Sequence, residues 1–265
     1  MADYPNVDTR QRARASDTPT LSAAQRAAAA IVGDITRNLD PKLLSVLHDS
    51  MLSHSAHHGR AAVRQAVMAG TRAEDIADFY IPTLARAYGD LWTEDELTFG
   101  EVTIAVSRLQ TVLRDLEVYW PRANDTTTTS ATLMLVIPKD VFHTLGAFVL
   151  SGQLRRKGIS VKMVLGGTPK TIADELSASS YDAIFLSASQ SDTLESLRLI
   201  IDAVNAAAKD VPPIVIGGPI LDVETAETVM AETGANYATG HAEEALRHCG
   251  LLTTKQDDAP TNYRG

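Results

Sequence analysis

The sequence predicts an α + α/β protein in which a helical bundle precedes a five-stranded parallel sheet. Up to residue 121, apolar residues recur with the spacing of helices that pack on one face. A polar stretch rich in small residues, 122–131, then interrupts this pattern and is typical of a linker. After it, short apolar runs alternate with helical stretches, which indicates a parallel sheet covered on both faces.

The region 21–121 is expected to form a bundle of four main helices, with one more at its front as an alternative. Asp40 and Pro41 combine an N-cap residue with proline at the first helical position. Gly70 is expected to end the next helix. Thr71–Glu74 matches a capping box ahead of a third helix, in which Pro82 predicts a kink. The apolar positions of the last helix follow: Val102, Ala105, Val106, Leu109, Val112, Leu113 and Leu116.

The region 132–252 is expected to form a doubly wound, flavodoxin-like domain. The predicted strands are 132–137, 161–165, 183–186, 214–216 and 236–239. The predicted helices are 143–157, 169–178, 193–208, 223–232 and 241–250. Ligands of such sheets bind at the carboxyl ends of the strands, so the loops there are the places to look for a site. Segments 1–20 and 253–265 are predicted to be a mobile arm and a flexible tail.

Composition excludes several classes of protein. The 24 basic and 33 acidic residues give a net charge of −9, which argues against nucleic-acid binding through bulk charge. A single cysteine, Cys249, excludes a disulfide framework, a cysteine-rich zinc site and an iron–sulfur cluster. No apolar run approaches the roughly 18 residues that span a bilayer, and the first residues lack a secretory signal. The expectation is a soluble, cytoplasmic protein with no membrane partner.

The loops at the strand ends carry a histidine, serines and a glycine pair. His143 follows the first strand and Gly146 stands three residues later, although a surface histidine and a helix glycine are the alternative reading. Ser187 and Ser189 follow the third strand. Gly217–Gly218 follow the fourth, where glycines often serve turn geometry alone. No dinucleotide fingerprint, P-loop or nucleophile elbow is present, which argues against nicotinamide enzymes, P-loop NTPases and α/β-hydrolases.

Together these motifs resemble those of cobalamin-binding domains. His143–Gly146, Ser187–Ser189 and Gly217–Gly218 are similar to the family's His-x-x-Gly, Ser-x-Leu and Gly-Gly motifs. The segment Gly89–Trp92 resembles part of the four-helix cap that accompanies such domains in methionine synthase and in CarH repressors. The resemblance covers about residues 40–250.

Within that group, the chain most resembles the AerR/PpaA proteins of purple photosynthetic bacteria. The residues that carry this likeness are Phe142–Gly146 and Leu154–Arg156.

The resemblance implies a site for cobalamin, with a hydroxo, methyl or adenosyl upper ligand. His143 would replace the cofactor's own lower base on cobalt, for which neutral imidazole is a suitable ligand. Ser187 would bind the displaced nucleotide tail. Trp92 would cover the upper face of the corrin ring, and the alternative is a tryptophan in the core of the bundle. The residues implied in cofactor binding are Trp92, Thr144, Leu145, Gly146, Ser187, Ser189, Gly217 and Gly218.

Three departures from the family patterns bear on function. Val141 stands where methionine synthase has an aspartate two residues before the histidine, which counts against a methyltransferase. Ser189 replaces the usual leucine of the third loop. Glu101 matches the acidic position of the CarH cap, but Val102 and Thr103 follow it in place of a histidine.

The function implied by the resemblance is that of a regulator without enzymatic activity. Such an antirepressor responds to light or redox state and acts on a repressor of photosynthesis genes of the CrtJ/PpsR type. Residues 1–40 are too short for the DNA-binding domain of CarH, so no direct contact with nucleic acid is expected. The alternatives are a corrinoid-carrying subunit of a methyltransferase system and a sensor that binds haem through His143.

Other histidines and the cysteine have simpler readings. His54 and His58 could form a metal-binding pair, but a solvated helix surface is favoured over that reading. His241 is expected at the start of the last helix, and Cys249 is expected to be a small buried hydrophobic residue.

Overall fold

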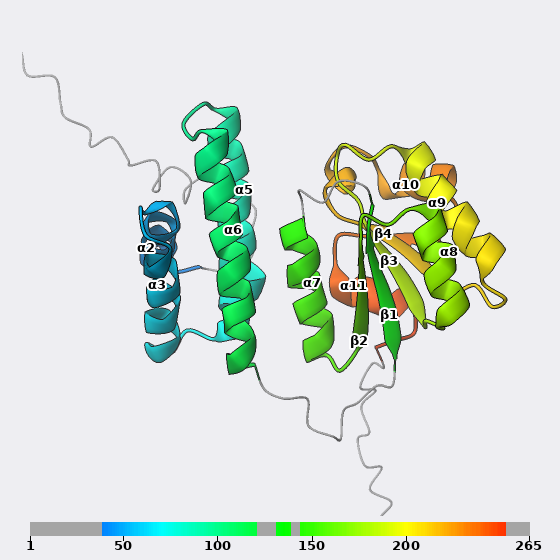
Figure 1. Ribbon diagram of the computed structural model, residues 1–265, viewed down its shortest axis with the longest axis horizontal. Helices are drawn as coiled ribbons and strands as arrows, with labels where there is room; N and C mark the ends of the chain where they lie inside the picture. Colours follow the sequence, from blue (N-terminus) through cyan, green and yellow to red (C-terminus); the bar gives the residue numbers. More distant parts are fainter. Residues whose placement is uncertain (1–38, 121–130, 139–143, 253–265) are drawn as a thin grey trace, which may run out of the picture.

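The computed structural model describes residues 39–120, 131–138 and 144–252. The predicted arm 1–20, the tail 253–265, nearly all of the linker 122–131 and His143 lie outside the described residues. Figure 1 shows the helical part and the sheet as two blocks, with helix α7 (Thr144–Arg156) between them. Among the described residues, no helix combines the length and the apolar character that crossing a bilayer requires.

The helical part begins as the sequence predicts. Helix α2 (Pro41–Leu52) has Asp40 at its N-cap, where the carboxylate accepts a hydrogen bond from the Lys42 N–H. Helix α3 (Ala56–Met68) is followed by Gly70 at φ +101°.

The third helical stretch contains a change of helix type. Helix α4 (Ala73–Asp75) continues through the π-helix η1 (Ile76–Tyr80) into α5 (Ile81–Thr93). Pro82, where a kink was predicted, lies in the first turn of α5, directly after the π-helical turn. Because proline has no N–H, the regular hydrogen-bond ladder is interrupted there. Helix α6 (Phe99–Leu116) and a short 3-10 turn, η2 (Glu117–Tyr119), complete this part.

The predicted capping box at Thr71–Glu74 is wrong. The N–H of Thr71 donates to the carbonyl of Ala66, and the N–H of Gly70 donates to Val67, so Thr71 still belongs to the end of α3. A capping box is found instead at the start of α6. The Glu101 carboxylate accepts from the Thr98 N–H at 2.8 Å, and Thr98 Oγ1 accepts from the Glu101 N–H at 3.3 Å.

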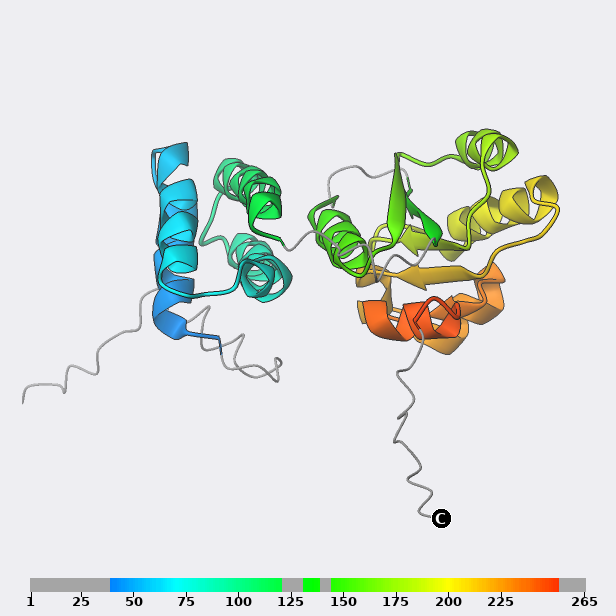
Figure 2. The same cartoon turned by 90° about the horizontal axis from the view of Figure 1, so that it is seen from below.

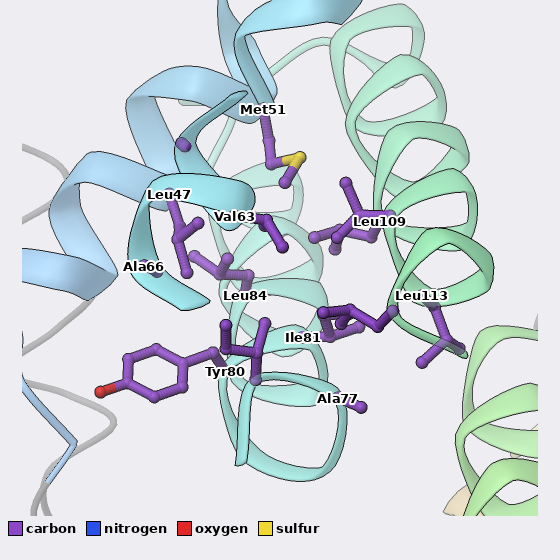
Figure 3. Close-up of a cluster of buried hydrophobic side chains, with 14 of the residues drawn as sticks. Leu47, Met51, Val63, Ala66, Ala77, Tyr80, Ile81, Leu84, Leu109 and Leu113 are labelled. Carbon is purple, nitrogen blue, oxygen red and sulfur yellow. The ribbon is translucent and has the colours of Figure 1, made fainter. Parts of the chain in front are cut away.

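The core of the helical part is made by side chains from each of its long helices. Figure 3 shows side chains from four helices gathered in this core: Leu47 and Met51 of α2, Val63 of α3, Leu84 of α5 and Leu109 of α6. All of these side chains are buried, and α7 adds two more residues to the same cluster from the other side, Leu145 and Val149. The helical part therefore shares its core with the first helix after β1.

The strands form the predicted parallel sheet. They are β1 (Thr132–Ile137), β2 (Ser160–Leu165), β3 (Ala183–Ser187), β4 (Ile214–Gly217) and β5 (Tyr237–Ala238). Their order across the sheet is β2-β1-β3-β4-β5, and each neighbouring pair is parallel. This confirms the predicted fold class, a helical bundle followed by a flavodoxin-like five-stranded sheet.

Helices cover both faces of the sheet. On one face, α8 (Pro169–Ala178), α9 (Leu194–Ala207) and α10 (Ala226–Thr233) pack through an aliphatic cluster. On the other, α7 packs beside α11 (Ala242–His248). Helix α10 begins later than predicted, because the 3-10 turn η4 (Pro219–Asp222) follows β4 and Thr225 then caps the helix.

Helix α7 is buried on two sides. Ala147 and Leu154 pack against the sheet, whereas Leu145 and Val149 pack into the core of the helical part. Figure 2, turned by 90° from Figure 1, again shows α7 between the two blocks. The helix that begins at the candidate site is therefore also the structural link to the helical part.

Candidate functional site

The loops after β3 and β4 meet at the carboxyl edge of the sheet, as predicted. Ser187 and Gly217 are register partners in the parallel pair. Beyond them, the Ala188 N–H donates to the Gly217 carbonyl at 2.8 Å, and the Ile220 N–H donates to the Ala188 carbonyl at 3.3 Å. The two predicted loops are thus joined by backbone hydrogen bonds.

The glycine pair in these loops serves the packing of the protein itself. A Cβ atom at Gly217 would lie 2.8 Å from the carbonyl oxygen of Thr239. Gly218 has φ +102°, and its Cβ would lie 2.5 Å from the carbonyl oxygen of Ala188. Turn geometry and close backbone packing therefore require both glycines, and their contact with a cofactor tail stays a prediction.

Gly146 is a different case. It lies on an exposed side of α7, and a Cβ atom built there would meet nothing within 4 Å. Nothing among the described residues fills the space that its missing side chain leaves. This position can therefore accommodate a ligand along the first turn of the helix.

The two serines of the third loop also differ. Ser189 is 7% exposed, and its hydroxyl lies 3.0 Å from Asp192 Oδ2 and 2.8 Å from Ser191 Oγ. Ser187 is partly buried, and its hydroxyl makes no hydrogen bond within the described part of the chain. Of the two, Ser187 has the hydroxyl available for a ligand.

Asp192 is a residue that the sequence interpretation missed. Its carboxylate accepts the Ser189 N–H at 2.7 Å in addition to the hydroxyl, and so holds the loop in shape. The spacing Ser-x-x-Asp is a local turn signal that could have identified it.

The start of α7 is anchored to the helical part. Leu145 is buried in the core of that part, and the Thr144 side chain is 6% exposed. The amide Nε2 of Gln110, on α6, donates a hydrogen bond to Thr144 Oγ1 at 3.1 Å. The sequence interpretation missed Gln110, because no local pattern links two residues 34 positions apart. His143 directly precedes this contact in the chain and lies outside the described residues.

Trp92 lies at the end of α5 and is 48% exposed. The alternative reading, a tryptophan in the core of the bundle, is therefore wrong. Its ring centroid lies 6.1 Å from that of Phe99, which is 68% exposed at the start of α6. Figure 1 shows the turn between α5 and α6 at the same end of the molecule as the start of α7. Two aromatic rings at this end thus have faces available to a ligand.

Glu101 has a local structural role. Its hydrogen bonds from the hydroxyl and the backbone N–H of Thr98 lower the pKa of its carboxyl group. The capping box is sufficient to explain a glutamate at this position, and no contact with a ligand is needed to account for it.

The remaining candidates do not form a second site. His54 lies in the bend between α2 and α3, so His54 and His58 do not share a helix face. In the described ranges, no group of three or more histidine, cysteine or acidic side chains could hold a metal ion. His241 is an exposed residue at the start of α11, as expected. Cys249 is half-buried, and burial raises the pKa of its thiol to about 11.

A charged contact joins the helical part to the far end of α7. Arg156 Nη2 donates to Asp78 Oδ1 at 2.5 Å, with side chains that are 13% and 18% exposed. The guanidinium also lies over the Trp120 ring, 4.5 Å from its centroid. Gly152 makes room for this ring, since a Cβ there would lie 2.9 Å from it. Sequence periodicity gave no signal for this contact, although Arg156 belongs to the segment that resembles the AerR/PpaA group.

A family model described as the B12 binding domain matches residues 132–250. A protein of Rhodobacter capsulatus is 32% identical over 179 residues, which cover 68% of this chain and 92% of the relative. The chain belongs to the B12-binding domain family. The relative is described as an uncharacterized 20.5 kDa protein in the bchF-crtJ intergenic region.

A solved structure of a corrinoid protein shares the fold. The monomethylamine corrinoid protein of Methanosarcina barkeri superposes with a TM-score of 0.65 at 15% identity, over 80% of this chain and 99% of that one. A cobalamin-binding protein of Desulfitobacterium hafniense gives a TM-score of 0.40 at 20% identity, over 80% and 98% of the two chains. The first likeness extends over the helical part as well as the sheet and supports the fold.

Cobalamin is the cofactor of this B12-binding domain. The residues present fit its nucleotide tail in two respects: the open side of α7 at Gly146 and the available hydroxyl of Ser187. The cobalt ligand and the individual contacts remain predictions.

Proposed function

We propose that this protein is a cobalamin-binding transcriptional regulator, responsive to light or redox state, without enzymatic activity of its own. In this proposal it acts as an antirepressor through a repressor of the CrtJ/PpsR type and so controls photosynthesis genes. The observation that carries the proposal is the Rhodobacter capsulatus relative, whose description places it beside crtJ. The net charge of −9 favours a protein partner over nucleic acid.

The residues of the chain would hold the cofactor in a defined way. Bound cobalamin supplies a cobalt ion whose upper ligand can be lost or exchanged. The imidazole of His143 would serve as the lower ligand, and the hydroxyl of Ser187 would hydrogen-bond the tail. Gly146 would leave room for the tail, and Trp92 would cover the upper corrin face and exclude water.

The signal would be transmitted as a shift in population between two arrangements of the helical part on α7. A change in what the Trp92 ring contacts would lead the helical part to favour a different position. The repressor would bind one of these arrangements more tightly than the other.

Cofactor content is the first test. Protein purified from a culture supplied with cobalamin should be red, should keep its corrinoid on a desalting column and should contain cobalt by metal analysis. Iron in place of cobalt would instead indicate a haem sensor.

The cobalt ligand is tested by His143→Ala. This variant should lose the absorption spectrum of histidine-ligated cobalamin, whereas His241→Ala, at an exposed position, should keep it. An unchanged spectrum in His143→Ala would overturn the ligand assignment.

The regulatory role is tested by titrating the cobalamin-loaded protein against a CrtJ/PpsR-type repressor, in the dark and after illumination. The expected result is an affinity that changes with illumination. If the repressor does not bind and a corrinoid methyltransferase methylates the cofactor, the protein is a methyl carrier instead.

A further inference from the structure

We propose that Asp192 is a positioning residue for the nucleotide tail of cobalamin. It acts through the turn that follows β3, and so through Ser187, whose hydroxyl is available to a ligand. The inference rests on the proposed function, because it requires Ser187 to bind the tail. It adds a residue from outside the motifs to those that would recognise the complete cofactor.

Asp192 closes this turn with both its side chain and its backbone. Its Oδ2 accepts the Ser189 N–H at 2.7 Å and lies 3.0 Å from Ser189 Oγ. The N–H of Asp192 donates in return to the Ser189 carbonyl at 3.2 Å. Ser189 is 7% exposed, so removal of the carboxylate would leave its N–H without an acceptor in a buried setting, which is costly.

The carboxylate is attached to a rigid element. Asp192 directly precedes Thr193, the N-cap of α9, whose Oγ1 accepts the Ser196 N–H. The apolar side of α9 is buried in the cluster that packs on the sheet. The hydrogen bonds of Asp192 therefore fix the turn to a helix that the core holds in place.

Ser187 depends on the turn because strand pairing holds it from one side. It is the register partner of Gly217 in β4, whereas the pairing of β3 with β1 ends one residue earlier, at Leu186. Its hydroxyl makes no hydrogen bond within the described part of the chain. No side-chain contact of that kind fixes the hydroxyl, so its position follows that of the backbone.

One peptide unit transmits the restraint from Asp192 toward Ser187. The unit between Ala188 and Ser189 is bonded at both ends: its carbonyl accepts from the Ile220 N–H at 3.3 Å, and its N–H donates to Asp192. A peptide unit is planar, so two bonds at its opposite ends fix how it is turned. Without Asp192, only the longer bond to Ile220 would hold this unit, and the backbone that carries Ser187 would be less well oriented.

Two corrinoids separate the tail from the rest of the cofactor. Cobinamide has the corrin ring and the cobalt of cobalamin but lacks the nucleotide tail. A residue that positions a tail-binding hydroxyl should affect the binding of cobalamin and not that of cobinamide. A residue that only stabilises the fold should affect both equally. The readout is therefore the preference for cobalamin, the ratio of the two dissociation constants, from absorption titrations of the full-chain apoprotein.

The test compares Asp192→Ala, Ser187→Ala and the double variant. Each single variant should lower the preference for cobalamin by about three- to tenfold, the size expected for one hydrogen bond. The double variant should lose no more than Ser187→Ala alone, because Asp192 acts through Ser187. Asp192→Asn keeps an oxygen that can accept both hydrogen bonds, so it should retain the preference.

Asp202→Ala is the control for loss of charge. Asp202 is an exposed residue farther along α9, so this variant removes a carboxylate from the same helix and leaves the turn intact. Both dissociation constants should stay unchanged in it. A preference that falls equally in Asp192→Ala and Asp202→Ala would show an effect of charge and would contradict the positioning role.

The inference is overturned if Ser187→Ala lowers the preference and Asp192→Ala keeps it, or if Asp192→Ala weakens the binding of both corrinoids equally. An unchanged preference in Ser187→Ala would show instead that Ser187 does not bind the tail, and the tail contact of the proposed function would fail together with the inference. If Asp192→Ala does not fold, Asp192→Glu takes its place. The longer side chain moves the carboxylate out of a turn that requires a short one, so a preference equal to that of Asp192→Asn would overturn the inference.

Discussion

At the scale of single residues, the three glycines near the candidate site do different work. Gly217 and Gly218 let backbone segments of the protein approach one another, because side chains there would meet the carbonyl oxygens of Thr239 and Ala188. Gly146 allows no such internal contact and leaves its surroundings open. Glycine thus occurs in these motifs for two different physical reasons.

This difference predicts opposite outcomes for two substitutions. Gly146→Leu should leave the melting temperature unchanged or higher, since glycine costs a helix about 1 kcal/mol relative to good helix formers, while cobalamin binding weakens strongly. Gly218→Ala should destabilise the fold, because φ is +102° and the added Cβ would clash with Ala188. Thermal melts of the apoprotein and cobalamin titrations check both. Equal loss of stability in the two variants would contradict the assignment.

The buried His48 makes the stability of the helical part depend on pH. It is buried on α2, and its ring centroid lies 5.5 Å from that of Tyr88 on α5. Burial lowers the pKa of His48 below its usual 6.5, and the nearby Asp49 offsets part of this effect. The unfolded chain therefore takes up the proton at a higher pH than the folded one does.

The consequence is a specific pH dependence. The free energy of unfolding should be constant above about pH 6.5 with respect to this group and should fall as the pH drops from there toward the lower pKa of the folded state. His48→Phe should remove this slope in urea titrations at several pH values. Some carboxyl groups have lowered pKa values, such as those of Glu101 and Glu243. Their protonation changes the free energy of unfolding only below about pH 4.5. A slope that persists in the variant would count against His48 as its source.

At the scale of elements, α7 is held at both ends by side chains of the helical part. Its first residue accepts the hydrogen bond of Gln110, and its last residue, Arg156, pairs with Asp78 and stacks on Trp120. The second contact is charged and mostly buried, so removal of one partner leaves the other without compensation.

Arg156→Ala should therefore lower the free energy of unfolding by about 3 kcal/mol. Arg60→Ala is the matched control, because Arg60 pairs with Asp115 on the exposed surface between α3 and α6. That variant should have a much smaller effect, since exposed ion pairs are screened by solvent. Urea denaturation compares the free energies of unfolding of the two variants. Equal losses would show that the Arg156 contact contributes no more than an exposed ion pair.

Elements were predictable where the signal is local. The predicted strand 132–137 has the bounds of β1, because a strand buried on both faces is a continuous apolar run. The predicted helix 169–178 has the bounds of α8, because a proline is typical of the first helical position. The cap at Thr71 was misassigned, because the preceding glycine turn uses the N–H of that residue. The contacts of Gln110 and Arg156 join residues far apart in the chain, and no periodicity encodes such partners.

The candidate site followed the same rule. Motif spacing pointed to Ser187 and Gly217 at one sheet edge, and their pairing in the sheet brings them together. The motif spacing could not show that the hydroxyl of Ser187 is available to a ligand whereas that of Ser189 is hydrogen-bonded within its own loop. That difference depends on where the fold places Asp192.

At the scale of the whole molecule, the two parts share a core. Leu145 and Val149 belong to the segment matched by the B12 binding domain, yet they are buried among side chains of the helical part. Removing residues 1–131 would expose both to water.

A fragment of residues 132–252 is accordingly expected to aggregate or to bind a hydrophobic dye. The same fragment with Leu145→Lys and Val149→Lys should be more soluble, because the exposed face then carries charge. Sedimentation analysis of the two fragments measures the difference. A monomeric, dye-free unmodified fragment would contradict the shared core.

The positions of the two tryptophans give the protein a built-in optical readout. Trp92 stands beside Phe99 at the end of α5, and Trp120 lies under Arg156 at the far end of α7. Single-tryptophan variants would report separately on the two ends of the joint, by fluorescence and without an added label. A corrinoid absorbs visible and near-ultraviolet light, so energy transfer should quench the indole nearer to it more strongly. Emission from this pair would thus locate the bound cofactor in solution.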